Sequence, residues 1–214
     1  VYVQPVDLRR YLRRKLGSGL FATLTIILGN FFLRSWHRIS GLTFRSELQI
    51  LPITHFDDSM IAPVGTAAPS RIHIERTASY LNRRLFDNPR ACYVVAGAYS
   101  ASCCMGYVAW QIATRPDGER WLHIVDWQTR NDHGNAILRA LLATVSRKAV
   151  EAACGFVMVT LQSHDQRRVL SRAGFMARGD KKIVGVYAND PMRLATLAAA
   201  HWSLTDLSED NDGY

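Results

Sequence analysis

The chain has 214 residues, of which 48% are hydrophobic and 21% are charged. This is the composition of a globular protein, and the length is sufficient for one hydrophobic core of ordinary size. The formal net charge of +8 favours a phosphorylated ligand. A nucleic acid is disfavoured as the partner, because no zinc-finger, helix-turn-helix or RNA-recognition signature accompanies the charge.

The cysteines lie within or beside apolar runs and lack the paired spacing of a zinc site. They are Cys92, Cys103, Cys104 and Cys154. This pattern is typical of buried thiols in a reducing compartment. We therefore expect a cytoplasmic protein without a metal site.

The N-terminal segment is first basic and then apolar. In residues 6–16, leucines recur at helical spacing among arginines, which predicts a basic amphipathic helix. The following run, residues 20–33, is uncharged but has only 14 residues, whereas a membrane-spanning helix needs about 20. A full crossing is therefore the least favoured of three interpretations, and two others remain. The run packs on the body of the protein or on a neighbouring domain, or residues 6–33 make peripheral contact with a membrane surface.

The middle of the chain changes from a helical to an extended pattern. Residues 48–54 predict a strand, and residues 76–86 predict a short helix that ends before Asp87-Asn-Pro89. Three extended runs follow, separated by short segments rich in turn-forming residues. They span residues 93–99, 105–113 and 121–127. Short connections of this kind predict an antiparallel meander.

The second half alternates helix and strand. Residues 135–153 carry apolar side chains on one face and predict a helix of about five turns. The apolar run 156–161 predicts a strand covered on both faces. Residues 165–173 predict a helix that Gly174 closes, before a last extended segment. The expected fold is α/β, a mixed central sheet with an antiparallel meander, one parallel crossover and flanking helices.

The segment from Asn131 to Ile137 joins a predicted strand to the long helix. Gly134 and the small Ala136 allow backbone N–H groups to point outward at a helix N-terminus. Such an arrangement binds a phosphate or a pyrophosphate. The same residues also fit a simple helix start, with Asn131 or Asp132 as the N-cap.

This order of elements and motifs resembles the GNAT superfamily of acyl-CoA N-acyltransferases. Asn131, Gly134 and Ala136 occupy the spacing of the family's pyrophosphate loop, although asparagine stands where the family has glutamine or arginine. The segment from Leu170 to Phe175 is similar to the family's helix that ends in Gly-Phe. Each of these motifs alone is common in proteins. The resemblance rests on their occurring in the expected order and on the expected helices and strands.

Residues 80–89 resemble the opening of a domain found in two-domain members of the family. The resemblance implies an N-terminal arm or linker at residues 1–40, a GNAT-like domain at residues 41–204 and an acidic C-terminal tail at residues 205–214. In this interpretation, residues 1–5 are the tail of a preceding acyltransferase-like domain, which would be a partner of this one.

The resemblance implies an acyl-CoA-dependent N-acyltransferase, with acetyl-CoA as cosubstrate and a small-molecule or peptide amine as acceptor. The pyrophosphate would bind backbone amides of the loop, and the pantetheine arm would lie between strands 121–127 and 156–161. The implied cofactor-binding residues are Asn131, Asp132, His133, Gly134, Asn135, Ala136 and Ile137. Arg130 would add positive charge there, whereas Asp132 places a carboxylate beside the phosphates.

Transfer to an amine needs a base for the ammonium proton and an acid for the leaving thiolate. Asp126 and His123 are the candidate catalytic bases, with Asp126 preferred, and Glu75 is a third candidate. Strand alternation predicts Asp126 and Ile124 on one face, and His123 and Trp127 on the other. Only one of the two preferred bases would then face the substrate.

Leu170 stands where the family often has a tyrosine as the acid. A leucine cannot donate a proton, and Tyr187 on a later strand is the alternative donor. This substitution favours a second hypothesis, a catalytically inactive GNAT-like domain that serves as the ligand-binding or scaffold half of a larger protein.

Overall fold

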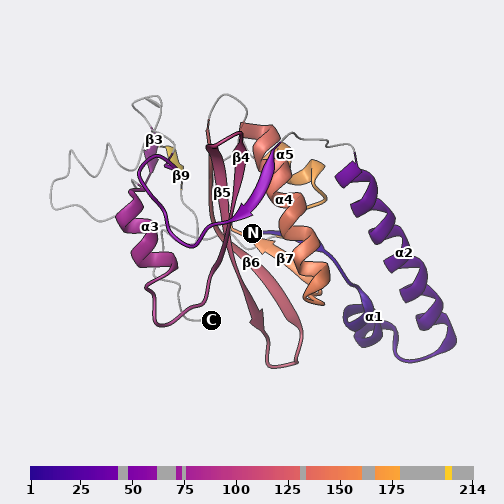
Figure 1. Cartoon of the computed structure of the whole chain (residues 1–214). Coiled ribbons are helices and arrows are strands. Elements are labelled where there is room, and N and C mark those ends of the chain that lie inside the picture. Colours follow the sequence, from indigo (N-terminus) through magenta and orange to yellow (C-terminus); the bar gives the residue numbers. More distant parts are fainter. Residues whose placement is uncertain are drawn as a thin grey trace.

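The computed structural model describes residues 1–42, 48–61, 71–73, 76–130, 134–160, 167–178 and 201–203. A mixed seven-stranded sheet forms its centre (Figure 1). In spatial order, its strands are β2 (Gln49–Pro52), β4 (Val94–Ser100), β5 (Cys103–Thr114), β6 (Arg120–Thr129), β7 (Phe156–Val159), β1 (Tyr2–Pro5) and β8 (Met176–Ala177). A separate short parallel pair consists of β3 (Arg71–His73) and β9 (His201–Ser203).

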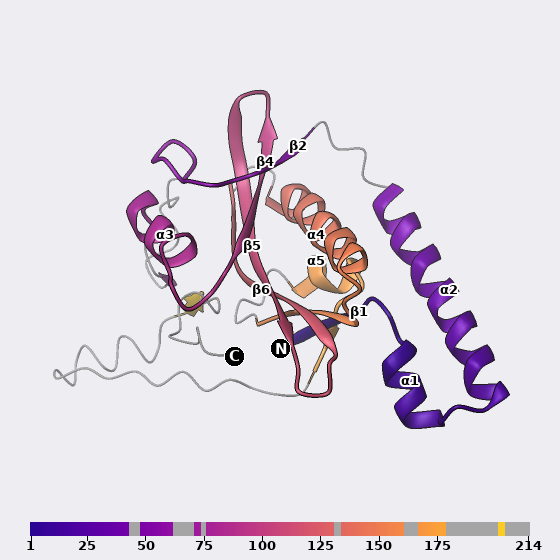
Figure 2. The same cartoon turned by 60° about the horizontal axis from the view of Figure 1, so that its bottom comes forward.

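Helices cover both faces of the sheet. Helix α3 (Ala78–Leu85) lies on one face, and α4 (Gly134–Glu151) and α5 (Arg167–Arg172) lie on the other (Figures 1 and 2). Helices α1 (Arg9–Leu16) and α2 (Leu20–Leu42) form a hairpin, and α2 packs on α4. The sheet therefore has two cores, which we call the α3 core and the α4 core.

The predicted fold class is confirmed. Strands β4, β5 and β6 form the antiparallel meander, and β6 continues through α4 into β7, which pairs with β6 in parallel. A parallel pair needs a long crossover, and the 18 residues of α4 supply it. Apolar side chains of α4, including Leu141 and Val145, are fully buried in the α4 core.

The N-terminal strand β1 lies inside the sheet, between β7 and β8 and antiparallel to both. The predicted arm of residues 1–40 thus begins with a strand of the sheet itself. Gln4 of β1 is buried, and its Nε2 donates to the carbonyl oxygen of Ala173 at 2.7 Å. Its Oε1 accepts from Oγ of Ser146 on α4, also at 2.7 Å. These bonds join β1 to α4 and to the end of α5.

Gly174 closes α5, as the sequence predicts. Its φ of 87° is in the left-handed region, where glycine has no steric penalty. The N–H of Gly174 donates to the carbonyl of Ser171, and the N–H of Phe175 donates to that of Leu170. This pair of bonds is a Schellman motif, and Leu170 and Phe175 pack together in the α4 core.

Helix α4 ends in the same kind of turn, but with Ala153 in the left-handed position at a φ of 53°. A non-glycine residue in this conformation is strained by about 1–2 kcal/mol. Glycine removes the strain, but its greater freedom in the unfolded chain offsets part of the gain in stability. Ala153→Gly should therefore raise the free energy of unfolding by about 0.5–1 kcal/mol, measured by urea denaturation. A lower free energy of unfolding in this variant would show that the backbone of Ala153 is not strained.

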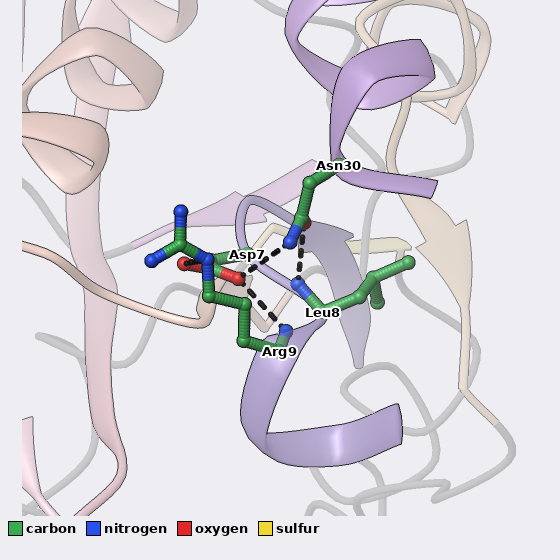
Figure 3. Close-up of polar contacts among 4 residues, drawn as sticks. All are labelled: Asp7, Leu8, Arg9 and Asn30. Atoms are coloured by element: carbon green, nitrogen blue, oxygen red, sulfur yellow. Dashed lines mark hydrogen bonds and ion pairs between the residues drawn. The ribbon is translucent and has the colours of Figure 1, made fainter. Parts of the chain in front are cut away.

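Asn30 of α2 fixes the hairpin of α1 and α2 (Figure 3). Its Oδ1 accepts from the backbone N–H of Leu8 at 3.0 Å, and its Nδ2 donates to Oδ1 of Asp7 at 3.1 Å. Asp7 also accepts from the backbone N–H of Arg9, at the first turn of α1. Asn30 is buried, so this polar cluster sets where α2 lies against the entry to α1.

Helix α2 is longer than the predicted apolar run, since it has 23 residues. One of its faces is buried at Ala22 and Ile26, and the helix contacts both α1 and α4. Among the described helices, none combines the length and the apolar character that a membrane span requires.

Candidate functional site

Strand β6 carries a β-bulge. Ala109 of β5 pairs with Asp126, and the next residue, Trp110, pairs with Ile124. Val125 is therefore an extra residue of β6. A bulge bends its strand and disrupts the ladder locally, and bulges are frequent beside active sites.

The bulge changes which side chains of β6 share a face. Ile124 and Trp127 both pack in the α4 core, although simple alternation places them on opposite faces. Val125 packs in the α3 core. The predicted alternation is therefore wrong at this point, because an inserted residue shifts the pattern by one position.

The two predicted bases lie on the same face. Asp126 is hydrogen-bonded to Tyr107, which belongs to the α3 core. His123 pairs with Gln111, two residues along β5 from Ala109 of that same core. The predicted separation of His123 and Asp126 is a second error with the same cause. Both side chains are buried on the α3 side of β6.

Strands β6 and β7 pair over only the first half of β6. The parallel register runs from Trp121 opposite Phe156 to Ile124 opposite Val159, where β7 ends. Strand β6 continues past the bulge to Thr129. Ligands of parallel sheets bind beyond the carboxyl ends of the strands. Within the described residues, β7 therefore does not pair with the second half of β6, whose β7 side we call the open edge.

Helix α4 begins next to this edge. It starts at Gly134, and its first turn contains no acidic side chain. The first N–H groups of a helix have no carbonyl partner within it and carry the positive end of its dipole, so they favour an anion. Asn135 is exposed and Ala136 half-buried, whereas Ile137 is buried and anchors the turn in the α4 core. The predicted loop residues Asn131, Asp132 and His133 lie outside the described residues.

Gly106 of β5 lies where β6 meets α4. A Cβ atom at this position would lie 2.5 Å from the carbonyl oxygen of Gln128 and 3.1 Å from Cγ2 of Ile137. The first contact is with backbone, which cannot move away without shifting β6. Because Gly106 has no side chain, the end of β6 can lie close to the first turn of α4.

Gly106→Ala should destabilise the domain by about 1–3 kcal/mol through overpacking. Gly19→Ala is the matched control, because a Cβ atom there would meet nothing within 4 Å. Thermal unfolding of both variants measures the difference. Equal melting temperatures of the two variants would show that β6 can shift to accommodate a Cβ atom at Gly106 without loss of stability.

Asp126 is fully buried and takes part in a polar cluster on the α3 face. Arg76 donates from Nε to Oδ2 at 3.0 Å and from a terminal nitrogen to Oδ1 at 2.8 Å. Tyr107 donates its hydroxyl to Oδ2 at 2.7 Å. The arginine side chain is only 11% exposed, so this bidentate ion pair is largely shielded from solvent.

Burial and charge shift the pKa values of both partners of Asp126. Burial lowers the pKa of Arg76, but the charge of Asp126 and its hydrogen bonds outweigh burial and raise it overall. Burial and then the charge of Asp126 raise the pKa of Tyr107 well above its ordinary value of 10.0. Tyr107 therefore stays protonated and donates to Asp126.

The shift at Tyr107 predicts a loss of stability in alkali. The native state binds the phenol proton more tightly than the unfolded state, so stability is full below pH 10 and falls as the pH rises toward the native pKa. Titration of this one phenol lowers the free energy of unfolding by at most about 1.4 kcal/mol per pH unit. Urea unfolding of Tyr107→Phe and of the wild type between pH 8 and 11 should show a shallower alkaline decline in the variant. An equal decline of stability with pH in the wild type and the variant would contradict the raised pKa of Tyr107.

Other predicted residues are placed as follows. Arg130 donates to the carbonyl oxygens of Cys104 and Ser59, at 2.9 and 3.0 Å. Leu170 is fully buried in the α4 core. Glu75 and Tyr187 lie outside the described residues.

The sequence interpretation missed Arg76 and Tyr107 as partners of Asp126. Arg76 lies 50 residues before Asp126, and no local pattern connects the two. Tyr107 carried a usable signal, because it lies on the strand adjacent to β6 in the predicted meander. A buried carboxylate on one strand calls for a donor on the next.

No family model matches the sequence, and no curated protein matches it. Solved structures do match the fold. An acetyltransferase from Trypanosoma brucei matches with a TM-score of 0.50 and 17% identity, over 65% of this chain and 99% of that one. A ribosomal-protein-alanine N-acetyltransferase from Brucella melitensis matches with a TM-score of 0.48 and 19% identity, over the same shares. The chain thus has the fold of the GNAT acetyltransferases.

Proposed function

We propose that this chain binds an acyl-CoA at the first turn of α4 and the open edge of β6, and transfers the acyl group, such as acetyl, to an amine. The observation that carries the proposal is the geometry of β6. The strand bulges at Val125 and precedes the N-terminus of α4 in the chain. Within the described residues, its pairing with β7 ends at Ile124.

The two parts of this site match the two parts of coenzyme A. The pyrophosphate is anionic and suits the N–H groups and dipole at the start of α4. The pantetheine arm contains amide groups, and these can pair with the N–H and C=O groups of a strand edge as an added strand would. The net charge of +8 favours the approach of such an anion.

The transfer step requires a neutral amine. The amine nitrogen attacks the thioester carbonyl carbon and the carbon–sulfur bond breaks. The nitrogen then loses one proton and the leaving thiolate gains one, so the products are an amide and the CoA thiol. His123 and Asp126 remain the proposed bases. Asp126 accepts hydrogen bonds from Arg76 and Tyr107, and substitution of each candidate separates their roles.

Isothermal titration with acetyl-CoA and with CoA tests the binding site. Both should bind, with dissociation constants between about 1 μM and 1 mM. Gly134→Glu should weaken binding of both by at least about tenfold, because it places a negative charge beside the pyrophosphate. Ala143→Glu adds the same charge at an exposed position later in α4 and should bind as the wild type does. Equal weakening by both substitutions would remove the first turn of α4 from the proposal.

Release of the CoA thiol from acetyl-CoA, in the presence of a panel of primary amines, tests the transfer. His123→Gln should lower kcat by about a hundredfold while leaving the affinity for acetyl-CoA within a factor of two. An unchanged kcat would exclude His123 as the base.

A second candidate function is binding of the acyl-CoA without transfer. It is favoured by Leu170, which is fully buried at the position where the resemblance implies a proton donor. Binding by titration together with no amine-dependent thiol release from any amine in the panel would favour this alternative.

A further inference from the structure

The outward face of α2 carries a continuous apolar surface, which we call the outer stripe. Its side chains are 55–85% exposed. They are Leu20, Phe21, Leu24, Ile27, Leu28, Phe31 and Phe32. Isolated exposed apolar residues are normal on proteins, but a contiguous patch of seven large ones marks a binding surface.

The outer stripe lies opposite the buried face of α2. Residues of the stripe recur every three or four positions and so share one side of the helix. Ala22, Ile26 and Asn30 alternate with them and are buried. Asn30 is also fixed by the polar cluster with Asp7 and Leu8 (Figure 3). The stripe therefore lies opposite the buried residues of α2, and the helix itself lies at the outer edge of the molecule (Figures 1 and 2).

Basic residues flank the outer stripe in the sequence, on α1 before it and on α2 after it. Between Asp7 and Glu47 the sequence contains no acidic residue, but it contains eight Arg or Lys. On α1, which packs beside α2, the basic residues Arg9, Arg13, Arg14 and Lys15 are exposed. Arg14 is near Asp117, at 3.3 Å, in a solvent-exposed pair that contributes little energy. Two more arginines, at positions 34 and 38, follow the stripe in the sequence of α2.

We infer that the hairpin of α1 and α2 docks the protein on an anionic membrane surface, with α2 lying flat. The outer stripe would enter the boundary between headgroups and acyl chains, and the basic residues would contact the acidic headgroups. The stripe is about 18 Å long from Leu20 to Phe32. The hydrocarbon core is about 30 Å thick, so the stripe matches a surface position rather than a crossing.

The charge distinguishes a lipid surface from a second copy of the chain as the occupant. A dimer through the outer stripe would bring two acid-free, strongly basic segments together, and like charges repel. Anionic lipids instead neutralise them, with about 1 kcal/mol gained per basic residue near the surface. This inference does not depend on the proposed acyl transfer, because none of its residues belongs to the site at β6 and α4.

Flotation of the full chain with vesicles tests the inference. Vesicles of phosphatidylcholine alone are compared with vesicles that also contain phosphatidylserine. The protein should float with the anionic vesicles and stay behind with the neutral ones. Point variants are needed, since deleting the N-terminal segment would also remove β1 from the sheet.

The triple variant Phe21→Gln, Ile27→Gln, Phe31→Gln should bind the anionic vesicles at least about a hundredfold more weakly. A matched control replaces three exposed apolar residues elsewhere, Leu51→Gln, Val150→Gln and Met176→Gln, and should bind as the wild type does. Arg9→Gln with Arg13→Gln should weaken binding by about fivefold per charge removed. Circular dichroism melts of each variant verify folding.

Three results would overturn the inference. The first is no flotation of the wild type with anionic vesicles. The second is equal flotation of the wild type and a folded triple variant. The third is a dimer in sedimentation equilibrium without lipid that the triple variant abolishes, which would assign the outer stripe to a second copy. Failure of acetyl-CoA to bind would leave all these readouts unchanged, so the two proposals fail separately.

Discussion

Asp126→Ala should lower the free energy of unfolding by about 3–5 kcal/mol, because it leaves the charge of Arg76 buried without its partner. Asp126 is 0% exposed and the Arg76 side chain 11%, so water cannot replace the lost carboxylate easily. The substitution also removes the acceptor of the Tyr107 hydroxyl. Urea denaturation followed by circular dichroism measures the loss.

Two further variants separate the cost of an unpaired charge from other effects. Replacing both partners, as Arg76→Met with Asp126→Leu, should recover much of the stability, since a buried ion pair contributes little over an apolar pair of similar volume. Glu151→Ala breaks the Lys148–Glu151 pair, whose side chains are about half exposed, and should cost less than about 1 kcal/mol. An Asp126→Ala variant within about 1 kcal/mol of the wild type would contradict a structural role for the cluster.

The same cluster bears on the proposed chemistry. If Asp126 serves to hold β6 at its bulge, Asp126→Asn should lower stability and acetyl-CoA affinity together. If it is instead a base, Asp126→Asn should lower kcat while the affinity for acetyl-CoA stays unchanged. The hydrogen bonds that the carboxylate accepts from Arg76 and Tyr107 favour the first outcome.

Removal of residues 1–5 should unfold the domain. Strand β1 pairs with β7 on one side and β8 on the other, and Tyr2, Val3 and Gln4 are buried. Their loss would expose two strand edges and remove the hydrogen bonds of Gln4 to Ser146 on α4 and to Ala173 after α5. The expected loss is about 5 kcal/mol or more, comparable to the total stability of a small domain. The readout is the thermal unfolding transition of the shortened chain.

A point substitution checks the same claim without shortening the chain. Val3→Asp places a carboxylate in the middle of the sheet and should cost at least about 3 kcal/mol. Val94→Asp is the control, because Val94 is 51% exposed on β4, and it should cost no more than about 1 kcal/mol. A cooperative transition near the wild-type temperature for both Val3→Asp and the shortened chain would show that β1 is dispensable.

The order of elements from β4 to α5 was predictable from local patterns. The meander has short turns between extended runs, and α4 has an apolar face that recurs at helical spacing. Gly174 before Phe175 marks the end of α5, because the left-handed position of a Schellman motif favours glycine. In each case neighbouring residues determine the structure.

The arrangement of the site was less predictable. An inserted residue at Val125 leaves no mark in the sequence, yet it places His123 and Asp126 on the same face. The pairing of Arg76 with Asp126 joins residues far apart in the chain. Strand β1 was missed as part of the sheet because its partners, β7 and β8, come more than 150 residues later. Only tertiary structure determines such contacts.

The N-terminal hairpin shows a further limit of periodicity. Apolar residues surround most of α2 between Leu20 and Phe32, so the pattern alone does not identify the packed face. The structure selects the side with Ala22, Ile26 and Asn30, because the small alanine and the bonded amide allow close packing. The remaining apolar side chains form the outer stripe.

The most direct test of the central claim is a map of CoA binding at single-residue resolution. Backbone amide resonances of ¹⁵N-labelled protein are recorded while CoA is added. We expect the largest shifts at the open edge of β6, from Val125 to Thr129, and at the first turn of α4, from Gly134 to Ile137. Shifts confined to other elements, or none at millimolar CoA, would contradict the proposed acyl-CoA site.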